Sequence, residues 1–270
     1  LKRKSMPEND STRNMLLALD IGNTSIHTGL FIDDHLTATW RVGVEAERTA
    51  DEYGVSLLNL LRTHNLSPND VSACIIGCDV PPLLPTFQEV SLNYFGIEPL
   101  VVGHGIRTGV RILYENPKQL GADRIIDAVA AIHLYGPPAI IVDFGTATVF
   151  DAVDNNGDYL GGAIAPGIGI ASEALFSRAA MLHRAQLERP PNAIGRNTTH
   201  ALQSGILLGY VGLVEGMVER FQEEIGPGAK VIATGGWAEQ IADETTVIDI
   251  VNKELTLTGL YILYGLNSGS

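Results

Sequence analysis

The alternation of hydrophobic and polar residues near the start of the chain predicts strands joined by tight turns. The apolar run at residues 15–19 ends in Asp20-Ile21-Gly22-Asn23-Thr24, and alternation then resumes over residues 26–32. Asp33-Asp34 interrupts it before a third alternating stretch at residues 36–41. Strict alternation is typical of half-buried strands, and Asp, Asn and Gly are typical of turns. We therefore predict a strand, a turn and a returning strand, followed by a third strand.

The residues that follow favour a mixture of helices and strands. Tyr53, Leu57, Leu58 and Leu61 recur at helical spacing, and Ser67-Pro68-Asn69-Asp70 marks a turn after them. We expect strands at residues 71–78, 99–102 and 231–236, and helices at residues 84–94, 121–135, 168–182 and 199–224. Such an alternation of strands and helices is typical of an α/β protein.

The second half of the chain repeats the pattern of the first. An apolar strand at residues 139–142 runs into Asp143-Phe144-Gly145-Thr146-Ala147-Thr148, and alternation then continues to an Asn156-Gly157 turn. Both halves thus hold an apolar strand that ends in Asp-x-Gly, followed by small polar residues and a returning strand. Asp20 and Asp143 are separated by nearly half of the chain, so we infer an internal duplication of two α/β domains.

The two Asp-x-Gly turns have the chemistry of phosphate binding. Glycine permits close approach of the backbone, and the N–H groups with the side chains of Asn23, Thr24, Thr146 and Thr148 supply donors. Each aspartate could hold a cation that screens phosphate charge. Neither a P-loop nor a Rossmann glycine motif is found in the sequence. A single Asp-x-Gly is most often only a hairpin turn, but the duplication, with Thr234-Gly235-Gly236 later in the chain, favours a phosphate site.

Between the two turns, Gly121-Ala122-Asp123-Arg124 opens a predicted apolar helix. An aspartate in a first helical turn is stabilised by the helix dipole, so Asp123 could simply cap this helix. It could also act as a general base that takes a proton from an attacking hydroxyl. Arg124 could contact an anionic substrate or be a solvated charge.

Composition narrows the function classes further. The chain has 270 residues, 45% of them hydrophobic, and a formal net charge of −13. This acidic balance argues against general nucleic-acid binding, and no apolar run approaches the length of a membrane span. The two cysteines, Cys74 and Cys78, lack the further ligands of a zinc site, so we expect reduced thiols in a cytoplasmic protein. Residues 1–14 have almost nothing to bury, and we expect a disordered extension there.

Taken in order, the motifs resemble those of type III pantothenate kinases. They are Asp20-Ile-Gly-Asn-Thr24, Asn116-Pro117 leading to Gly121-Ala-Asp-Arg124, Asp143-Phe-Gly-Thr-Ala-Thr148, Gly161-Gly-Ala-Ile-Ala-Pro-Gly167 and Gly195-Arg-Asn-Thr198. That family is part of the acetate kinase/sugar kinase/Hsp70/actin superfamily. The resemblance implies two duplicated actin-like (ribonuclease H-like) domains, at residues 15–124 and 125–270, with mixed sheets flanked by helices and an interdomain cleft.

The resemblance also implies an activity and its residues. The reaction would be ATP-dependent phosphorylation of pantothenate, the first step of coenzyme A biosynthesis, with Mg²⁺ arriving on ATP and K⁺ or NH₄⁺ as a further cation. Asp123 would be the general base and Asp143 would bind the monovalent cation. The remaining contacts would be to ATP from Asp20, Ile21, Gly22, Asn23, Thr24, Ser25, Ile26, His27 and Thr146, and to pantothenate from Tyr114, Gly121, Ala122, Asp123, Arg124 and Thr198. Members of the family are homodimers.

A few departures and two alternatives accompany this resemblance. His104 stands where the family usually has Pro, and Met181-Leu182-His183 replaces the usual Leu-Pro run. Gly77-Cys78-Asp79 stands where Ser-Ser-Val is common in the family, which could alter the shape of the pocket. A regulatory accessory homologue without kinase activity is one alternative, although Asp20, Asp123 and Asp143 are all retained. Another small-molecule kinase or a phosphatase of the superfamily is the second, and the motifs at residues 121–124 and 195–198 disfavour it.

Overall fold

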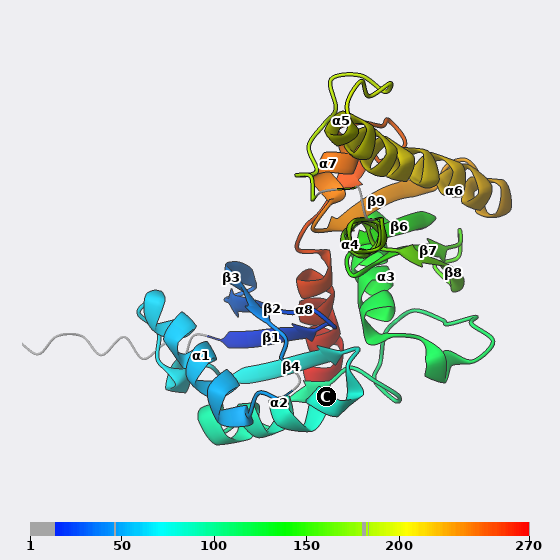
Figure 1. Cartoon of the computed structure of the whole chain (residues 1–270). Coiled ribbons are helices and arrows are strands. Elements are labelled where there is room, and N and C mark those ends of the chain that lie inside the picture. The colour runs from blue at the N-terminus through cyan, green and yellow to red at the C-terminus, as the bar shows by residue number, and fades with distance from the viewer. Residues whose placement is uncertain (1–13, 46, 180–181, 183, 270) are drawn as a thin grey trace, which may run out of the picture.

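The computed structural model describes residues 14–45, 47–179, 182 and 184–269. The extension expected at residues 1–14 therefore lies, apart from Asn14, outside the described residues. Within the described ranges the chain forms two five-stranded sheets with helices packed around them (Figure 1).

The first sheet contains the strands predicted at the start of the chain. Its order is β3-β2-β1-β4-β5, with β2 antiparallel to both β1 and β3, and with β4 and β5 parallel to β1. Helices α1 and α2 pack together beside this sheet. The bounds are β1 (Met15–Ile21), β2 (Ser25–Ile32), β3 (His35–Gly43), β4 (Ala73–Cys78), β5 (Leu100–Val101), α1 (Ala50–Thr63) and α2 (Leu84–Val90).

The second sheet repeats the topology of the first. Its order is β8-β7-β6-β9-β10, again with three antiparallel strands followed by two parallel ones. The strands are β6 (Ala139–Phe144), β7 (Ala147–Val153), β8 (Tyr159–Pro166), β9 (Lys230–Gly235) and β10 (Ile250–Val251). The identical strand order confirms the predicted duplication.

The duplication places Asp20 and Asp143 at equivalent points. Asp20 is the penultimate residue of β1 and pairs with His27 of β2 and Gly77 of β4. Asp143 is the penultimate residue of β6 and pairs with Val149 of β7 and Thr234 of β9. Ligands of α/β sheets bind beyond the carboxyl ends of parallel strands, so both aspartates lie where a ligand is expected.

Helices α3 (Ala122–Tyr135) and α8 (Leu255–Ser268) lie side by side where the two sheets meet (Figure 1). Leu257, Leu260 and Leu263 of α8 are fully buried in one cluster with Ile126 of α3 and residues of β1 and β4. The last helix of the chain thus returns to cover the first sheet. The division of the chain into residues 15–124 and 125–270 stays a prediction, since α8 belongs in sequence to the second half.

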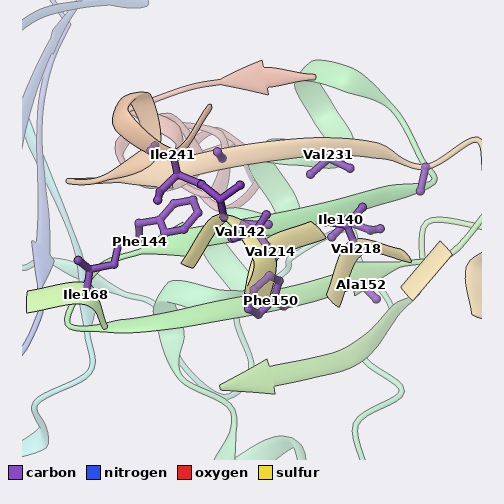
Figure 2. Close-up of a cluster of buried hydrophobic side chains, with 14 of the residues drawn as sticks. Ile140, Val142, Phe144, Phe150, Ala152, Ile168, Val214, Val218, Val231 and Ile241 are labelled. Carbon is purple, nitrogen blue, oxygen red and sulfur yellow. The ribbon is translucent and has the colours of Figure 1, made fainter. Parts of the chain in front are cut away.

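A second apolar core lies between the second sheet and helix α6 (Gly209–Ile225). Val214 and Val218 of α6 pack against Val142, Phe150 and other residues of the sheet (Figure 2). The remaining helices here are α4 (Ile168–Arg178), α5 (Thr198–Gln203) and α7 (Ala238–Ala242). Helix α4 is shorter than the predicted 168–182, because the backbone at Ala179 is already extended.

One helical segment of the described chain, Thr198–Ile225, is long and apolar enough to cross a membrane by length and composition alone. It comprises α5, a π turn (Ser204–Leu208) and α6. Its apolar residues include Ile206, Leu207, Val211 and Val214, which are buried in the second core. The packing therefore accounts for its hydrophobicity as that of a core helix.

Candidate active site

The turns that follow the two central strands meet at a cleft. The hydroxyls of Thr24, in the β1–β2 turn, and Thr146, in the β6–β7 turn, are 3.1 Å apart and within hydrogen-bond distance. Both predicted phosphate turns therefore face the same space. The cleft is lined by Asp20, Gly22, Asn23, Thr24, Ser25, His27, Arg41, Asp79, Asp123, Asp143, Gly145, Thr146, Ala147, Val149, Thr234, Gly235, Gly236, Lys253 and Thr256.

Two glycines let the backbone pack closely against the carboxylate of Asp143. A Cβ atom on Gly235 would lie 2.5 Å from one carboxylate oxygen of Asp143, and Gly235 has a φ of +88°, which disfavours other residues. A Cβ atom on Gly145 would lie 3.1 Å from the other oxygen. Glycine at these two positions therefore leaves the room that the Asp143 carboxylate itself occupies at the end of β6.

Aspartates from both sheets and from α3 concentrate negative charge in the cleft. Burial, together with the charges of neighbouring aspartates, raises the pKa of Asp20 well above its usual value. Burial and the charge of Asp123 raise the pKa of Asp79 to about 7, and the same two causes raise the pKa of Asp143 to about 7. Carboxyl groups that repel one another are stabilised by a bound cation, so this cleft favours cations and their phosphate complexes.

Asp127, one turn after Asp123 on α3, belongs to the same cluster but is fully inside the protein. Its side chain is 3% exposed, and its Oδ1 atom has no hydrogen-bond partner in the described part of the chain. Burial, followed by the charge of Asp143, raises its pKa well above the usual value. Asp127 therefore adds to the group of carboxyls in this cluster whose neutral form is favoured by burial.

The start of α3 holds Asp123 in the cleft. The N-cap residue, Gly121, has no side chain to cap the helix, and the Asp79 Oδ1 atom instead accepts the Ala122 N–H at 2.8 Å. The Asp123 Oδ1 atom accepts the Arg124 N–H at 2.7 Å. Asp123 is thus fixed at a helix N-terminus, where the dipole favours its anionic form.

Cationic side chains also face the cleft. Arg41 on β3 and Lys253 before α8 line it, and the positive charge of Arg41 acts on both Asp20 and Asp143. His27, which is buried, lies between Arg41 and Glu254: its Nδ1 is 3.4 Å from Arg41 Nη2 and its Nε2 is 3.1 Å from Glu254 Oε2. This chain of contacts holds the Arg41 guanidinium at the mouth of the first turn.

Arg124 is a buried structural cation in this structure. Its Nε and Nη2 donate to Asp151 Oδ1 at 2.9 and 2.6 Å, and Tyr159 donates its hydroxyl to the same oxygen at 2.7 Å. The ring of Tyr114 lies 5.8 Å from the guanidinium carbon. Arg124 therefore joins α3 to the second sheet and lies against the ring of Tyr114.

The structure brings together most of the residues predicted for the site. Tyr114 and the residues at 121–124 lie together at the start of α3, and Asp20, Asp143 and Thr146 line one cleft. Two residues of the predicted ATP loop, Ile21 and Ile26, instead place their side chains in the core of the first sheet. Thr198 is exposed at the first residue of α5 and does not line the cleft.

Several residues of the site were missed by sequence reasoning. Arg41 occupies an ordinary outward position of a strand, and Lys253 lies in a polar stretch between short elements, so neither carries a local signal. Asp79 was noted only as a departure from a family pattern. Among these additional cleft residues, only Thr234-Gly235-Gly236 has a recognisable signal in the sequence, because a glycine pair after a strand is typical of a close backbone approach.

The side-chain ligands in the cleft suit a weakly bound cation better than a divalent ion that is coordinated entirely by protein side chains. Among the described residues, no group of three or more His, Cys, Asp and Glu side chains is arranged to hold a metal ion. Asp143, which lines the cleft and has a raised pKa, offers one charged ligand. A monovalent ion, or Mg²⁺ that arrives with phosphates and keeps most of its waters, fits such a site.

Comparisons with known proteins agree with this geometry. A family model described as type III pantothenate kinase matches residues 16–220. The type III pantothenate kinase of Roseiflexus sp. (strain RS-1) is 51% identical over 94% of this chain and 99% of its own length.

Solved structures share the fold at lower identity. A Campylobacter jejuni protein described as a Baf family transcriptional activator has a TM-score of 0.61 at 19% identity, over 94% of this chain and 100% of that one. The inorganic polyphosphate/ATP-glucomannokinase of Arthrobacter sp. strain KM has a TM-score of 0.50 at 14% identity, over 94% and 99%. These two likenesses establish the duplicated actin-like fold alone.

Proposed function

This chain belongs to the type III pantothenate kinase family and transfers a phosphoryl group from ATP to pantothenate, and we propose that the transfer takes place in the cleft between its two sheets. The product is 4'-phosphopantothenate, which is used in coenzyme A biosynthesis. The observation that carries the assignment of the site is the meeting of Asp20, Asp123 and Asp143 in one cleft with both phosphate-type turns.

Asp123 is the general base of the proposed mechanism. As the primary hydroxyl oxygen of pantothenate attacks the γ-phosphorus of ATP in line, its proton passes to the Asp123 carboxylate. The bond from the γ-phosphorus to the β–γ bridging oxygen breaks, and ADP leaves. The Arg124 N–H, at 2.7 Å, and the α3 dipole orient the carboxylate for this step.

ATP is held by its phosphates between the two turns. Backbone N–H groups of residues 20–27 and the hydroxyl of Thr146 bind phosphate oxygens, with Ile21 and Ile26 contributing only their backbone. The bond between Thr24 and Thr146 links the two turns, so entering phosphates would replace it. Mg²⁺ bound to ATP neutralises charge on the transferring group.

Arg41 is the side chain that we place against the ATP phosphates. Arg41→Gln should raise the KM for ATP by about 10- to 100-fold, the range for losing one charge-assisted hydrogen bond. The KM for pantothenate should stay within about twofold. Arg220→Gln, on the surface of α6, is the matched control. Equal kinetics for both variants would remove Arg41 from the ATP site.

Asp143 is the proposed ligand of the monovalent cation. When bound, K⁺ or NH₄⁺ would screen the phosphate oxygens next to the Asp143 carboxylate. Asp143→Ala should abolish activation by KCl and also the KCl-specific rise of Tm over NaCl, a readout that is independent of turnover. Asp243→Ala, at the exposed end of α7, should keep both effects. Undiminished potassium activation of Asp143→Ala would refute this role.

Pantothenate is placed beside Asp123, against Tyr114, Gly121, Ala122 and Arg124. Thr198, which lies outside the cleft of one chain, is proposed as a further contact. A homodimer is also part of the proposal. In support, edge strand β8 exposes Leu160 and Ile164, and α4, which follows it, exposes Ile170 and Leu175. Exposed apolar side chains grouped in this way are typical of protein interfaces.

The protein is placed in the cytoplasm with small-molecule substrates as its partners. Both cysteines are free thiols, Cys74 buried and Cys78 half-buried, as expected in a reducing compartment. The net charge of −13 disfavours nucleic acid as a partner. A purely regulatory role has no support in the cleft, because all of its predicted catalytic carboxylates are present.

A coupled assay of ADP release tests the proposed function. ADP should form only when ATP and pantothenate are both supplied, and faster with KCl than with NaCl. ADP release that does not depend on pantothenate would contradict it.

A further inference from the structure

Asp79 combines three features that the proposed mechanism does not use. It follows the last residue of β4, it lines the cleft, and it contacts the first turn of α3, which is 43 residues away in sequence. Its backbone N–H is bonded to the Ile21 carbonyl at 3.0 Å, which ties it to the end of β1. Asp79 is thus rigidly mounted between the first phosphate turn and Asp123.

The contacts of Asp79 are made with the backbone that carries Asp123. Its Oδ1 atom accepts the Ala122 N–H at 2.8 Å and approaches the Asp123 nitrogen at 3.5 Å. These are the free N–H groups at the start of α3 that Gly121 cannot cap. An N-cap normally comes from the residue next to the helix, whereas here a distant strand supplies it.

The two carboxyl groups also lie against each other. A Cβ atom on Gly121 would be 2.5 Å from Asp123 Oδ1 and 3.1 Å from Asp79 Oδ1, so both side chains close over this glycine. Two carboxyl groups this close repel each other when both are ionised, and burial with the charge of Asp123 raises the pKa of Asp79 to about 7. Burial is the largest cause that raises the pKa of both groups, while the Arg124 N–H and the Arg124 charge lower that of Asp123. The Arg124 N–H and the Arg124 charge favour the anion at Asp123, and Asp79 is the neighbouring group that can carry the proton.

We propose that Asp79 is a positioning residue for Asp123, holding the first turn of α3 through one carboxyl oxygen and donating its own proton to the Asp123 carboxylate. This proposal rests on the proposed role of Asp123 as the base. It gives the unusual Gly77-Cys78-Asp79 segment of this chain a purpose: a second carboxyl group keeps the base oriented and ionised.

The charged groups around Asp79 set the sign of its pH effect. It faces Asp123 on α3, Asp20 on β1 and Asp143 on β6, and its charge also acts on the neighbouring Cys78. Arg41 of β3 acts on Asp20 and Asp143. Loss of the Asp79 proton removes the donor to Asp123 and adds a negative charge beside the ATP phosphates. Activity of the wild type should therefore fall as pH rises through about 7, the value to which burial and the Asp123 charge raise the pKa of Asp79.

The test compares Asp79→Asn and Asp79→Val with the wild type and with Asp70→Asn, which alters a capping carboxyl far from the cleft. Asn keeps an acceptor for the Ala122 N–H and a donor for Asp123 but cannot ionise, so it should retain kcat near neutral pH and lose the alkaline fall. Val removes both bonds and should lower kcat by about 10- to 100-fold, with the KM for ATP nearly unchanged. Asp70→Asn should behave as the wild type.

Other outcomes overturn the proposal. A wild-type pH profile in Asp79→Asn would reduce Asp79 to a helix cap, even if Asp79→Val unfolds or loses Tm. Wild-type kcat in Asp79→Val would exclude any positioning role. Failure of the wild type itself to phosphorylate pantothenate would instead refute the proposed function, so the two failures are distinguishable.

Discussion

Asp123→Asn is expected to lower kcat by about 10²- to 10⁴-fold, the range for removing a general base. The amide keeps the size of the carboxyl and can still accept the Arg124 N–H, so α3 should begin as before. Affinity for ATP should be retained or rise slightly, since a negative charge is removed from a cleft rich in carboxylates. Single-turnover kinetics and ATP titration measure the two quantities separately.

The matched control for Asp123→Asn is again Asp70→Asn. This change neutralises a carboxyl group that accepts the Ser67 N–H in a short turn remote from the cleft. It should keep the wild-type kcat. An Asp123→Asn enzyme with more than about a tenth of the wild-type rate would show that proton transfer does not depend on this carboxylate.

Asp151→Ala is expected to cause the largest loss of stability. The side chains of Asp151 and Arg124 are 4% and 8% exposed and form an ion pair at 2.6 Å. Removing the carboxylate leaves the Arg124 guanidinium buried without its anion and the Tyr159 hydroxyl without its acceptor. Breaking such a pair costs about 3–5 kcal/mol of the free energy of unfolding, measurable by urea denaturation at constant m-value.

An exposed ion pair provides the comparison for Asp151→Ala. Glu173 and Arg184 are also 2.6 Å apart, but their side chains are 53% and 76% exposed. Glu173→Ala should change the free energy of unfolding by only about 0–1 kcal/mol, because water screens and replaces that interaction. Similar losses in the two variants would mean that the Arg124–Asp151 pair does not hold α3 to the second sheet.

Local pattern was sufficient to predict the strands and their duplication. The apolar stretches after Asp20 and after Asp143 predict returning strands, and the structure shows both β1–β2 and β6–β7 pairs, although these strands are buried on both faces. Helix α8, in contrast, is not among the elements predicted from the sequence. It is covered by the first sheet and by α3, so Leu255, Leu257, Leu260 and Leu263 have no regular polar face beside them. Without a polar face, periodicity cannot separate a buried helix from a strand.

The candidate site was predictable where residues are consecutive. The two Asp-x-Gly turns and residues 121–124 are local motifs, and the structure brings them to one cleft. The continuous motif at residues 20–27 predicts ATP contacts for Ile21 and Ile26 as well. Their side chains point into the core instead, because side chains alternate between the two faces of a strand. Arg41 and Asp79 reach the cleft only through pairing of β3 with β2 and of β4 with β1, and such long-range register has no signature in the local sequence.

The central claim is that Asp123, in this cleft, accepts the proton of pantothenate as ATP phosphorylates it. Phosphorus NMR of the reaction mixture tests this most directly, with ATP, Mg²⁺, K⁺ and pantothenate supplied to the wild type and to Asp123→Asn. The wild type should convert ATP to ADP and 4'-phosphopantothenate in equal amounts, and Asp123→Asn should form both at least about 100-fold more slowly. ADP and free phosphate without phosphopantothenate, or equal rates for the two proteins, would contradict the claim.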